Sequence, residues 1–197
     1  DVKNFEVGDR VFVHHHVACL KCHYCLRGDF TLCKRFHETN IKPGGLAEYF
    51  KVPAPNLQLD TMKIPDNLPF DEATLIEPIG CCLRALKKCG IQKGDSIAVI
   101  GAGATGIIHV RLSEILGATK IIVSDFIDYR LNVAKAFGAD IVVNPKSEAI
   151  SDIVKAETDG RGVDIVVVTA PSLEAYQAGL DVCLKSVKLY IFAPTEP

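Results

Sequence analysis

The feature that most restricts the fold is an alternation of short apolar runs with helical patterns in the second half of the chain. The runs are rich in Ile and Val, which is typical of strands buried on both faces of a parallel sheet. We predict strands at 96–100, 120–124, 141–144, 164–169 and 187–193. The intervening segments predict helices at 104–116, 128–137, 147–157 and 172–184, with Gly117 and Gly138 as stops. Right-handed crossovers then give an α/β fold with a doubly wound parallel sheet.

A glycine-rich turn, Gly-Ala-Gly-Ala-Thr-Gly at 101–106, directly follows the first of these strands. Gly101 permits a tight turn, Gly103 lets the backbone approach a pyrophosphate, and Gly106 permits close packing of helix on strand. The amides of Ala104 and Thr105 then meet the phosphate at the positive end of the helix. The context of strand, turn and helix predicts a dinucleotide site.

An acidic residue, Asp125, stands at the end of the second predicted strand. A carboxylate there accepts hydrogen bonds from an adenosine ribose and repels a 2′-phosphate, which favours NAD over NADP. The neighbouring Arg130 leaves the alternative open, because a guanidinium attracts a 2′-phosphate. Thr169 and Ala170, at the end of the fourth strand, are expected to line the cofactor channel.

Four cysteines near the start of the chain have the spacing of a closed metal site. Two, two and seven residues separate Cys19, Cys22, Cys25 and Cys33. Zinc in structural sites takes four thiolates in a tetrahedron, and two-residue gaps allow a backbone knuckle to point successive sulfurs inward. The remaining cysteines, Cys81, Cys82, Cys89 and Cys183, lie among apolar residues and are expected to be small buried side chains.

The first half of the chain reads as strands and loops. Val11–Val13 and the alternating stretch 46–52 are predicted strands. The next segment contains several prolines and is predicted to be an irregular connector. A helical pattern then begins at Asp71, is expected to be interrupted at Pro78, and continues toward Cys89. Residues 1–91 and 92–197 are therefore predicted as two domains, with the cysteine lobe at about 17–36.

Composition excludes several classes of partner. Of 197 residues, 48% are apolar, and 22 basic residues are scattered among 24 acidic ones for a net charge of −2. This balance argues against nucleic acid or an anionic membrane as the main partner. The first residues form neither a basic leader nor an apolar segment, so a cytoplasmic location is the default expectation.

Together these features resemble the zinc-containing medium-chain alcohol and polyol dehydrogenases. The resemblance rests on the cysteine lobe, Gly-Gly-Leu-Ala-Glu-Tyr at 44–49, Leu-Ile-Glu-Pro at 75–78, the glycine turn, and Asp125 with Arg130 five residues later. It implies that residues 1–91 are part of a β-rich GroES-like catalytic domain and 92–197 part of an NAD-binding Rossmann domain. It also implies that the four cysteines hold a structural zinc and that Arg130 joins Asp125 in holding the ribose.

The resemblance further implies a catalytic zinc whose cysteine and Gly-His-Glu histidine ligands come before the first residue of this chain. None of the six histidines has that context, and the pattern stops after the fifth strand. The chain is therefore expected to be part of a protein of roughly 350 residues, and inactive alone.

Glu77 is the catalytic residue that the resemblance indicates in this chain. In the polyol-like branch its counterpart is a zinc ligand or is hydrogen-bonded to the zinc's water. The other interpretation is a helix acid stabilised by the dipole. Cys81 or Cys82 could supply a thiolate instead, although both look like helix-packing residues.

The histidines invite a metal interpretation that we do not favour. His14, His15 and His16 are expected to lie in a β-like stretch, where alternate imidazoles point to opposite faces and cannot converge on one ion. We expect a structural role for them, with His15 or His16 near the substrate cleft. His109 is expected to be a packing or surface residue, and His23 and His37 are not needed as ligands beside four sulfurs.

The predicted function is hydride transfer between NAD and a secondary alcohol or polyol, such as a sugar alcohol, a sugar or a hydroxy amino acid, in a homodimer or homotetramer. Two alternatives remain open at this point. One is a zinc-free reductase of the same superfamily, against which the cysteine lobe and the Glu-Pro pair argue. The other is a non-catalytic module that binds zinc and NAD.

Overall fold

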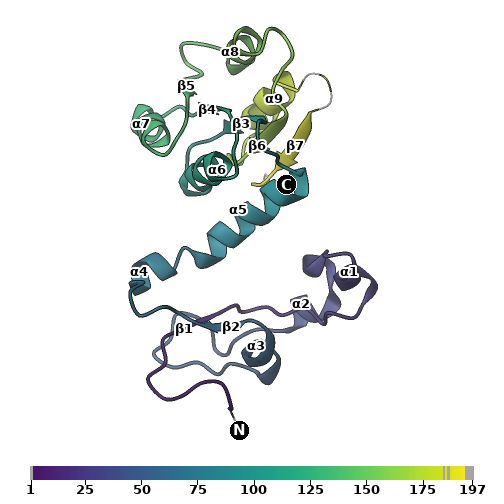
Figure 1. The fold of residues 1–197 in the computed structure, drawn as a ribbon, viewed down its shortest axis with the longest axis vertical. Helices are drawn as coiled ribbons and strands as arrows, with labels where there is room; N and C mark the ends of the chain where they lie inside the picture. The colour runs from purple at the N-terminus through teal and green to yellow at the C-terminus, as the bar shows by residue number, and fades with distance from the viewer. Residues whose placement is uncertain (1, 184, 186, 194–197) are drawn as a thin grey trace. The chain divides into compact units, whose positions relative to one another are not determined.

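The computed structural model describes residues 2–183, 185 and 187–193, and it divides into two compact units, Asp1–Glu77 and Pro78–Pro197. The second unit contains a five-stranded sheet in the order β5-β4-β3-β6-β7, with all neighbours parallel (Figure 1). Its strands are β3 (Ser96–Ile100), β4 (Lys120–Ser124), β5 (Ile141–Val143), β6 (Ile165–Val168) and β7 (Lys188–Ile191). This order confirms the doubly wound topology, because the chain runs outward from β3 in one direction and then in the other.

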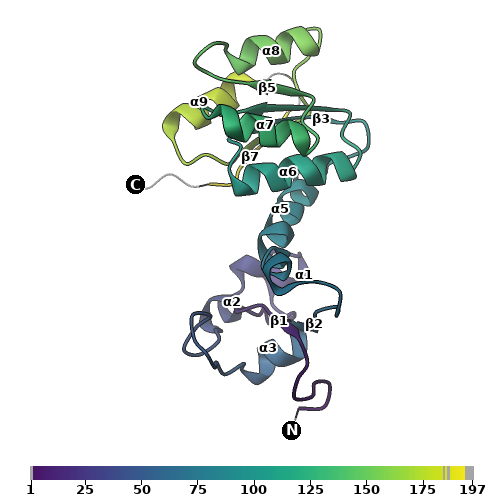
Figure 2. The ribbon, with the colours of Figure 1, turned by 90° about the vertical axis from the view of Figure 1, so that its left-hand side faces the viewer.

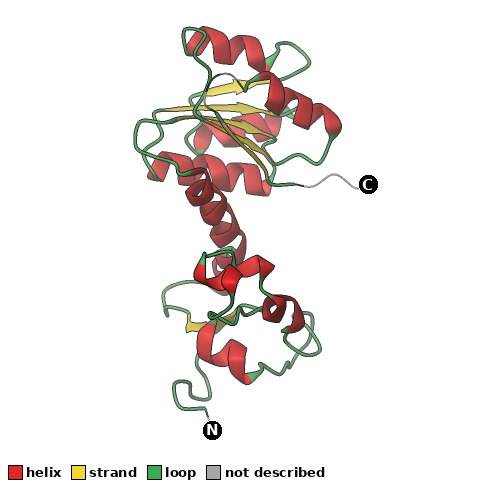
Figure 3. Ribbon diagram, turned by 90° about the vertical axis from the view of Figure 1, so that its right-hand side faces the viewer, coloured by secondary structure: helices red, strands yellow, loops and turns green. Residues whose placement is uncertain are grey.

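Helices cover both faces of this sheet (Figures 2 and 3). They are α6 (Ala104–Ile115), α7 (Asp128–Ala136), α8 (Ile150–Glu157) and α9 (Leu173–Asp181), together with the later turns of α5 (Ile76–Cys89). Alternate residues of each strand point to opposite faces. Ile97 and Val99 pack with α5, α6 and α7, whereas Ala98 and Ile100 pack with α8 and α9.

The predicted elements of this unit are confirmed, with small differences at their ends. β3 and β4 begin and end where predicted, and α6 and α7 end just before Gly117 and Gly138. β5, β6 and β7 are shorter than predicted, and α8 begins three residues after position 147. Residue 184, at the predicted end of the last helix, lies outside the described residues.

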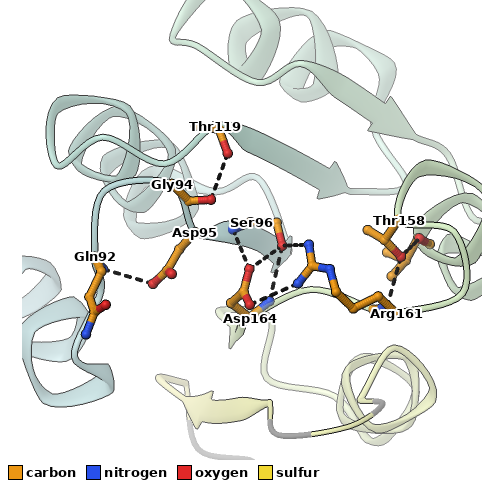
Figure 4. Close-up of polar contacts among 10 residues, drawn as sticks. Gln92, Gly94, Asp95, Ser96, Thr119, Thr158, Arg161 and Asp164 are labelled. Carbon is orange, nitrogen blue, oxygen red and sulfur yellow. Dashed lines mark hydrogen bonds and ion pairs between the residues drawn. The ribbon is translucent and has the colours of Figure 1, made fainter.

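A polar cluster joins the amino ends of β3 and β6 (Figure 4). Asp164 accepts hydrogen bonds from the Ser96 amide at 2.8 Å, the Ser96 hydroxyl at 2.6 Å and Arg161 Nη1 at 3.0 Å. Burial raises the pKa of Asp164, but the hydrogen bonds from Ser96 and Arg161 outweigh it, and the pKa lies below its ordinary value. The cluster lies at the amino ends of the strands, whereas the glycine turn follows the carboxyl end of β3. It therefore stabilises the sheet and is not part of the candidate nucleotide site.

The first unit contains little regular structure within its described residues. β1 (Val11–Val13) pairs antiparallel with β2 (Thr61–Lys63). Short helices make up the remainder: α1 (His23–Leu26), the 3₁₀ turn η1 (Phe30–Leu32), α2 (Lys34–Glu38), α3 (Ala54–Leu59) and α4 (Phe70–Ala73). No helix in the described part of the chain is long and apolar enough to cross a membrane.

Two predictions for the first half of the chain are wrong. Residues 46–52 do not form a strand; Lys51 makes an isolated bridge with Lys42, while Leu46 and Tyr49 are exposed. An alternating pattern needs a neighbouring strand and a buried face, and this stretch lacks both among the described residues. Pro78 does not interrupt a helix either, because α4 ends at Ala73 and Pro78 is the third residue of α5, where its missing N–H costs nothing.

Candidate metal centre and nucleotide site

Three short elements bring the four cysteines together. Cys22 caps the start of α1, Cys25 lies within α1, and Cys33 joins η1 to α2. Between Cys19 and Cys22 the backbone turns sharply at Leu20, whose φ is +59°. This left-handed turn is rare for a residue with a Cβ, and here it forms the knuckle between two of the cysteines.

The sulfur positions fit a tetrahedral zinc ion. All four sulfurs lie within 4.8 Å of one another. Cys25 Sγ is 3.8 Å from Cys19 Sγ and 3.5 Å from Cys22 Sγ. A tetrahedron with Zn–S bonds of about 2.3 Å has S–S edges of about 3.8 Å. The donor set and its dimensions therefore match a structural zinc site. No second group of three or more such ligands converges within the described residues.

The electrostatics of the cluster are those of a thiolate site. A hydrogen bond from the Cys19 amide to Cys33 Sγ, at 3.4 Å, outweighs burial, and the pKa of Cys33 lies at about 6. Backbone hydrogen bonds from Lys21 and Cys22 likewise lower the pKa of Cys19. Burial instead raises the pKa of Cys25 to about 11. Cys25 thus keeps its proton while its neighbours Cys19 and Cys33 lose theirs more readily. Binding of a cation would favour loss of the Cys25 proton as well and would stabilise the four thiolates together.

The glycine turn lies between β3 and α6 in a conformation that requires two of its glycines. Gly101 has φ +102°, and a Cβ there would lie 2.8 Å from Thr169 Oγ1. A Cβ on Gly106 would lie 2.1 Å from the carbonyl oxygen of Gly101. At Gly103, by contrast, a Cβ would meet nothing within 4 Å, so this position faces open space just before the amino end of α6. A phosphate group would approach there.

Asp125 is fixed beside this turn. Its Oδ2 accepts a hydrogen bond from the amide of Ala102 at 2.8 Å, and its Oδ1 accepts one from the amide of Ile127 at 2.9 Å. The residue is 9% exposed, and Arg130 Nη1 lies 3.7 Å from Oδ2. The structure thus brings Asp125 and Arg130 together. It adds a contact that the sequence did not indicate, between the acid and the glycine turn itself.

Thr169 holds the same turn from the other side. Its hydroxyl donates to the carbonyl oxygen of Gly101 at 2.9 Å, with the carbonyl of Ile100 at 3.2 Å. Ala170 is half-buried next to it. Thr169 therefore has a structural role, because it links the end of β6 to the glycine turn. Thr169 and Ala170 stay candidates for lining the cofactor channel.

Glu77 lies half-buried in the first turn of α5. Its charge reaches the imidazole of His15, since Glu77 opposes the lowering of the His15 pKa that burial and the neighbouring His16 and His14 produce. The pKa of His15 lies below its ordinary value, so the imidazole is mostly neutral at pH 7. Glu77 is thus coupled electrostatically to one of the three consecutive histidines.

The prediction that the three consecutive histidines point to opposite faces is wrong. β1 ends at Val13, and the chain bends at His15. The ring centroids of His14 and His15 are 5.1 Å apart, and those of His15 and His16 are 4.1 Å apart. His14 Nδ1 forms a hydrogen bond with the carbonyl oxygen of His16 at 2.5 Å, and His16 Nδ1 forms one with the carbonyl oxygen of Thr39 at 2.7 Å.

Two residues that sequence reasoning missed shape this bend. Asn56 is fully buried and donates from Nδ2 to the carbonyls of His14, at 3.1 Å, and His15, at 2.9 Å. The Thr39 hydroxyl accepts a hydrogen bond from the amide of Val17 at 2.8 Å. Nothing in the local sequence identifies either partner, because the contacts join residues 22 to 42 positions apart.

The remaining cysteines and histidines are placed as follows. Cys82 and Cys89 are buried, as predicted, and Cys183 is half-buried, but Cys81 is exposed, which corrects its predicted burial. Cys81 faces away from the core because the buried side of α5 carries Cys82, Ala85 and Leu86. His109 is fully buried and packs edge-on against Phe192. His23 and His37 are exposed.

Two family models match different parts of the chain. The family model for zinc-binding dehydrogenases matches residues 104–194, and that for the alcohol dehydrogenase GroES-like domain matches residues 1–66. L-threonine 3-dehydrogenase of Pyrococcus furiosus is 37% identical over 180 residues, covering 91% of this chain and 50% of the relative. Sorbitol dehydrogenase of Bacillus subtilis is 35% identical over 192 residues, covering 96% and 53%.

A solved structure of a zinc-binding dehydrogenase from Sinorhizobium meliloti 1021, bound to NADP, matches with a TM-score of 0.85 and 25% identity. The match covers 98% of this chain and 56% of that one. The chain therefore spans about half the length of the relatives it matches. It belongs to the zinc-dependent medium-chain dehydrogenase family.

Proposed function

We propose that the whole protein is a zinc-dependent oxidoreductase that transfers a hydride between NAD and a secondary alcohol or polyol. The observation that carries the proposal is the phosphate turn at 101–106, open at Gly103 and flanked by Asp125, in a chain that also folds a four-sulfur cluster. The named relatives act on threonine and sorbitol, both of which carry secondary hydroxyl groups. A sugar alcohol, a sugar or a hydroxy amino acid is the substrate class that we infer.

The cysteine cluster has a structural task in this proposal. Four sulfurs complete a tetrahedral shell and leave no open position for a substrate. The zinc would instead stabilise a lobe whose own buried apolar group comprises Ala18, Cys25 and Cys33, with Phe36 packed against it.

The nucleotide residues divide their work between phosphate and ribose. The backbone of Gly103, Ala104 and Thr105 faces the pyrophosphate at the amino end of α6. Asp125 orients the adenosine ribose, with Arg130 beside it. Because Asp125 is nearly buried, its negative charge is poorly screened and opposes a 2′-phosphate, which supports NAD over NADP.

Glu77 is the residue of this chain that we assign to the reaction. When bound, zinc supplies Lewis-acid stabilisation for the substrate oxygen, and NAD accepts the hydride. A carboxylate at position 77 is a suitable zinc ligand or outer-shell partner. The imidazole of His15 interacts electrostatically with Glu77 and, because its pKa is lowered, adds little positive charge at pH 7.

The test is metal analysis combined with a substrate screen on the whole protein. We expect about two zinc ions per chain and reduction of NAD by secondary alcohols or polyols. Exchange of Glu77 for Gln should lower turnover, and NAD should serve better than NADP. Two zincs per chain without NAD-linked turnover on any member of the panel would instead favour the non-catalytic module. Turnover with about one zinc per chain, bound by the four cysteines, would favour a reductase that has no catalytic zinc.

We also propose a homodimer or homotetramer in the cytoplasm. A cluster of four metal-ready thiols is compatible with a reducing compartment, where thiols do not pair as disulfides. Light scattering of the whole protein, and its location by fluorescent fusion, would check both statements.

A further inference from the structure

The guanidinium of Arg10 makes an unusual set of contacts within the first unit. Nη1 donates hydrogen bonds to the carbonyl oxygens of Pro65, at 3.0 Å, and Asp66, at 2.9 Å. Nη2 donates to the carbonyl of Leu68 at 2.5 Å. The same guanidinium lies over the ring of Phe70, with its Cζ 4.3 Å from the centroid.

These acceptors are main-chain carbonyls rather than a carboxylate, so the guanidinium fixes the path of the backbone. A planar fork of donors can satisfy three carbonyls and stack on a ring at the same time, which a lysine ammonium cannot do. Four of the six residues from 65 to 70 are thereby held by one side chain. The segment contains Pro65 and Pro69 and has no strand or helix of its own before Phe70.

This segment leads directly to Glu77. Phe70 opens α4, whose turn is closed by the hydrogen bond from the Thr74 amide to the Phe70 carbonyl at 3.1 Å. The amide of Leu75 bonds the carbonyl of Glu72 at 3.0 Å, and α5 then begins at Ile76. The chain therefore passes from Phe70 to Glu77 through one short, hydrogen-bonded turn.

The other end of the support is the β1–β2 pair. The amide of Ile64 donates to the carbonyl of Arg10 at 2.9 Å, so the backbone of Arg10 is itself held in the ladder. The strand that follows Arg10 leads to His15, whose imidazole senses the charge of Glu77. Arg10 and His15 thus flank one strand, and the guanidinium of Arg10 holds the segment that precedes Glu77.

We propose that Arg10 is a positioning residue for Glu77: its guanidinium clamps the 65–70 segment and thereby fixes where the Glu77 carboxylate lies. The proposal rests on the proposed function, in which Glu77 serves the catalytic zinc. A carboxylate displaced by about 1 Å costs turnover on the order of 10- to 100-fold even though the displaced group remains present.

The test is a double-mutant cycle in the whole protein, with kcat and KM for the best alcohol of the panel. As a readout independent of turnover, zinc per chain is measured after dialysis, and Arg10→Met is expected to lose zinc beyond the four-cysteine site more readily than Lys63→Met does. Arg10→Met should lower kcat by about 10- to 100-fold and change KM by less than about threefold. Arg10→Lys, which keeps the charge but not the fork, should restore only part of this loss. Once Glu77 is exchanged for Gln, the Arg10→Met exchange should cause no comparable further loss.

Lys63→Met is the matched control. Lys63 lies opposite Val11 in the same strand pair, and its ammonium group forms an ion pair with Asp9 at 2.8 Å. This exchange should leave kcat within about twofold of the unmodified protein. If Arg10→Met does not fold, Phe70→Leu removes the ring beneath the guanidinium at a site that is 62% exposed, and a smaller kcat loss that vanishes with Gln at 77 is expected.

The outcomes distinguish a failure of the positioning role of Arg10 from a failure of the proposed role of Glu77. Equal losses from Arg10→Met with Glu or Gln at position 77 would mean that Arg10 acts by general stability, and the positioning role would be rejected. An unchanged kcat in Glu77→Gln alone would instead remove Glu77 from the reaction, and the proposed function of Glu77 would fail first. The positioning role of Arg10 is supported if Arg10→Met and Glu77→Gln each lower kcat and the double variant has a kcat no lower than that of Glu77→Gln alone.

Discussion

The cysteine lobe and the nucleotide sheet reach order by different physical routes. In the sheet, β3 and β6 are fully buried, and each face packs against its own group of helices. In the lobe, the buried apolar group consists of Ala18, Cys25 and Cys33, with three half-buried residues around it. Hydrophobic burial thus specifies the sheet, whereas the lobe depends on convergent sulfurs. A region with so small a core needs a metal to fix its fold.

The largest effect that this contrast predicts is the loss of the lobe without zinc. Exchange of Cys33 for Ser, or chelation, should remove most of the roughly 10 kcal/mol or more that a structural zinc contributes. Hydrogen exchange should then show residues 17–38 unprotected while β3 and β4 remain protected. Cys81→Ser is the matched control, since that cysteine is exposed, and it should retain zinc. A protected lobe in the metal-free protein would show that packing alone holds it.

The converse change removes apolar volume from the sheet. Ile97 is fully buried, and its exchange for Ala should lower the free energy of unfolding of the second unit by about 2–5 kcal/mol. Urea unfolding would measure the change, and zinc content would be unaffected. Ile115→Ala, at a position that is 65% exposed, should cost far less. If both exchanges cost the same, the sheet core would not be the source of stability.

A smaller loss of stability is predicted for a substitution in the glycine turn at 101–106. A Cβ on Gly106 meets the Gly101 carbonyl, so Gly106→Ala should destabilise the second unit by about 1–3 kcal/mol and weaken NAD binding. Gly80, within α5, has open space for a Cβ, and Gly80→Ala should stabilise the protein by up to about 1 kcal/mol. Calorimetry with and without NAD would measure both. Unaltered NAD affinity in Gly106→Ala would contradict the role of the turn.

The smallest predicted effect concerns pH. The pKa of Asp164 is lowered in the folded protein, so its stabilising contribution is present above the ordinary carboxyl pKa and is lost as pH falls through the lower folded value. Asp164→Asn should cost about 1 kcal/mol at pH 7, because the site is partly exposed and screened. The difference from the unmodified protein should vanish once the pH lies below the lowered pKa of Asp164 in the folded protein. A constant difference down to that pH would attribute the loss to shape rather than charge.

The same contrast explains which parts of the structure could be predicted from the sequence. The bounds of β3 and β4 were predicted to the residue because a fully buried strand must be apolar throughout and must end where polar residues begin. The four cysteines were found because a metal site leaves a fixed spacing. Residues 46–52 were mistaken for a strand because alternation alone does not show whether a partner strand exists.

The long-range polar contacts could not be predicted in this way. Asn56 holds the histidine bend across about 40 residues, and Arg10 reaches the 65–70 segment across 55 to 58 residues. Such contacts leave no periodic pattern, since each joins one side chain to backbone atoms of a distant segment. The histidine bend illustrates the consequence: a β-like run of residues was expected, and distant hydrogen bonds decided the shape instead.

The hydrogen bond from the Ala102 amide to Asp125 has a consequence for altering cofactor preference. The carboxylate that would discriminate between ribose and a 2′-phosphate also accepts a hydrogen bond from the glycine turn at 101–106, which we propose as the pyrophosphate site. Replacing Asp125 with a neutral, shorter side chain to admit NADP would therefore release the buried Ala102 amide and loosen the loop at the same time. Selectivity and loop rigidity are linked through one oxygen atom, so a cofactor switch in this chain requires a second substitution that supplies a new acceptor for that amide.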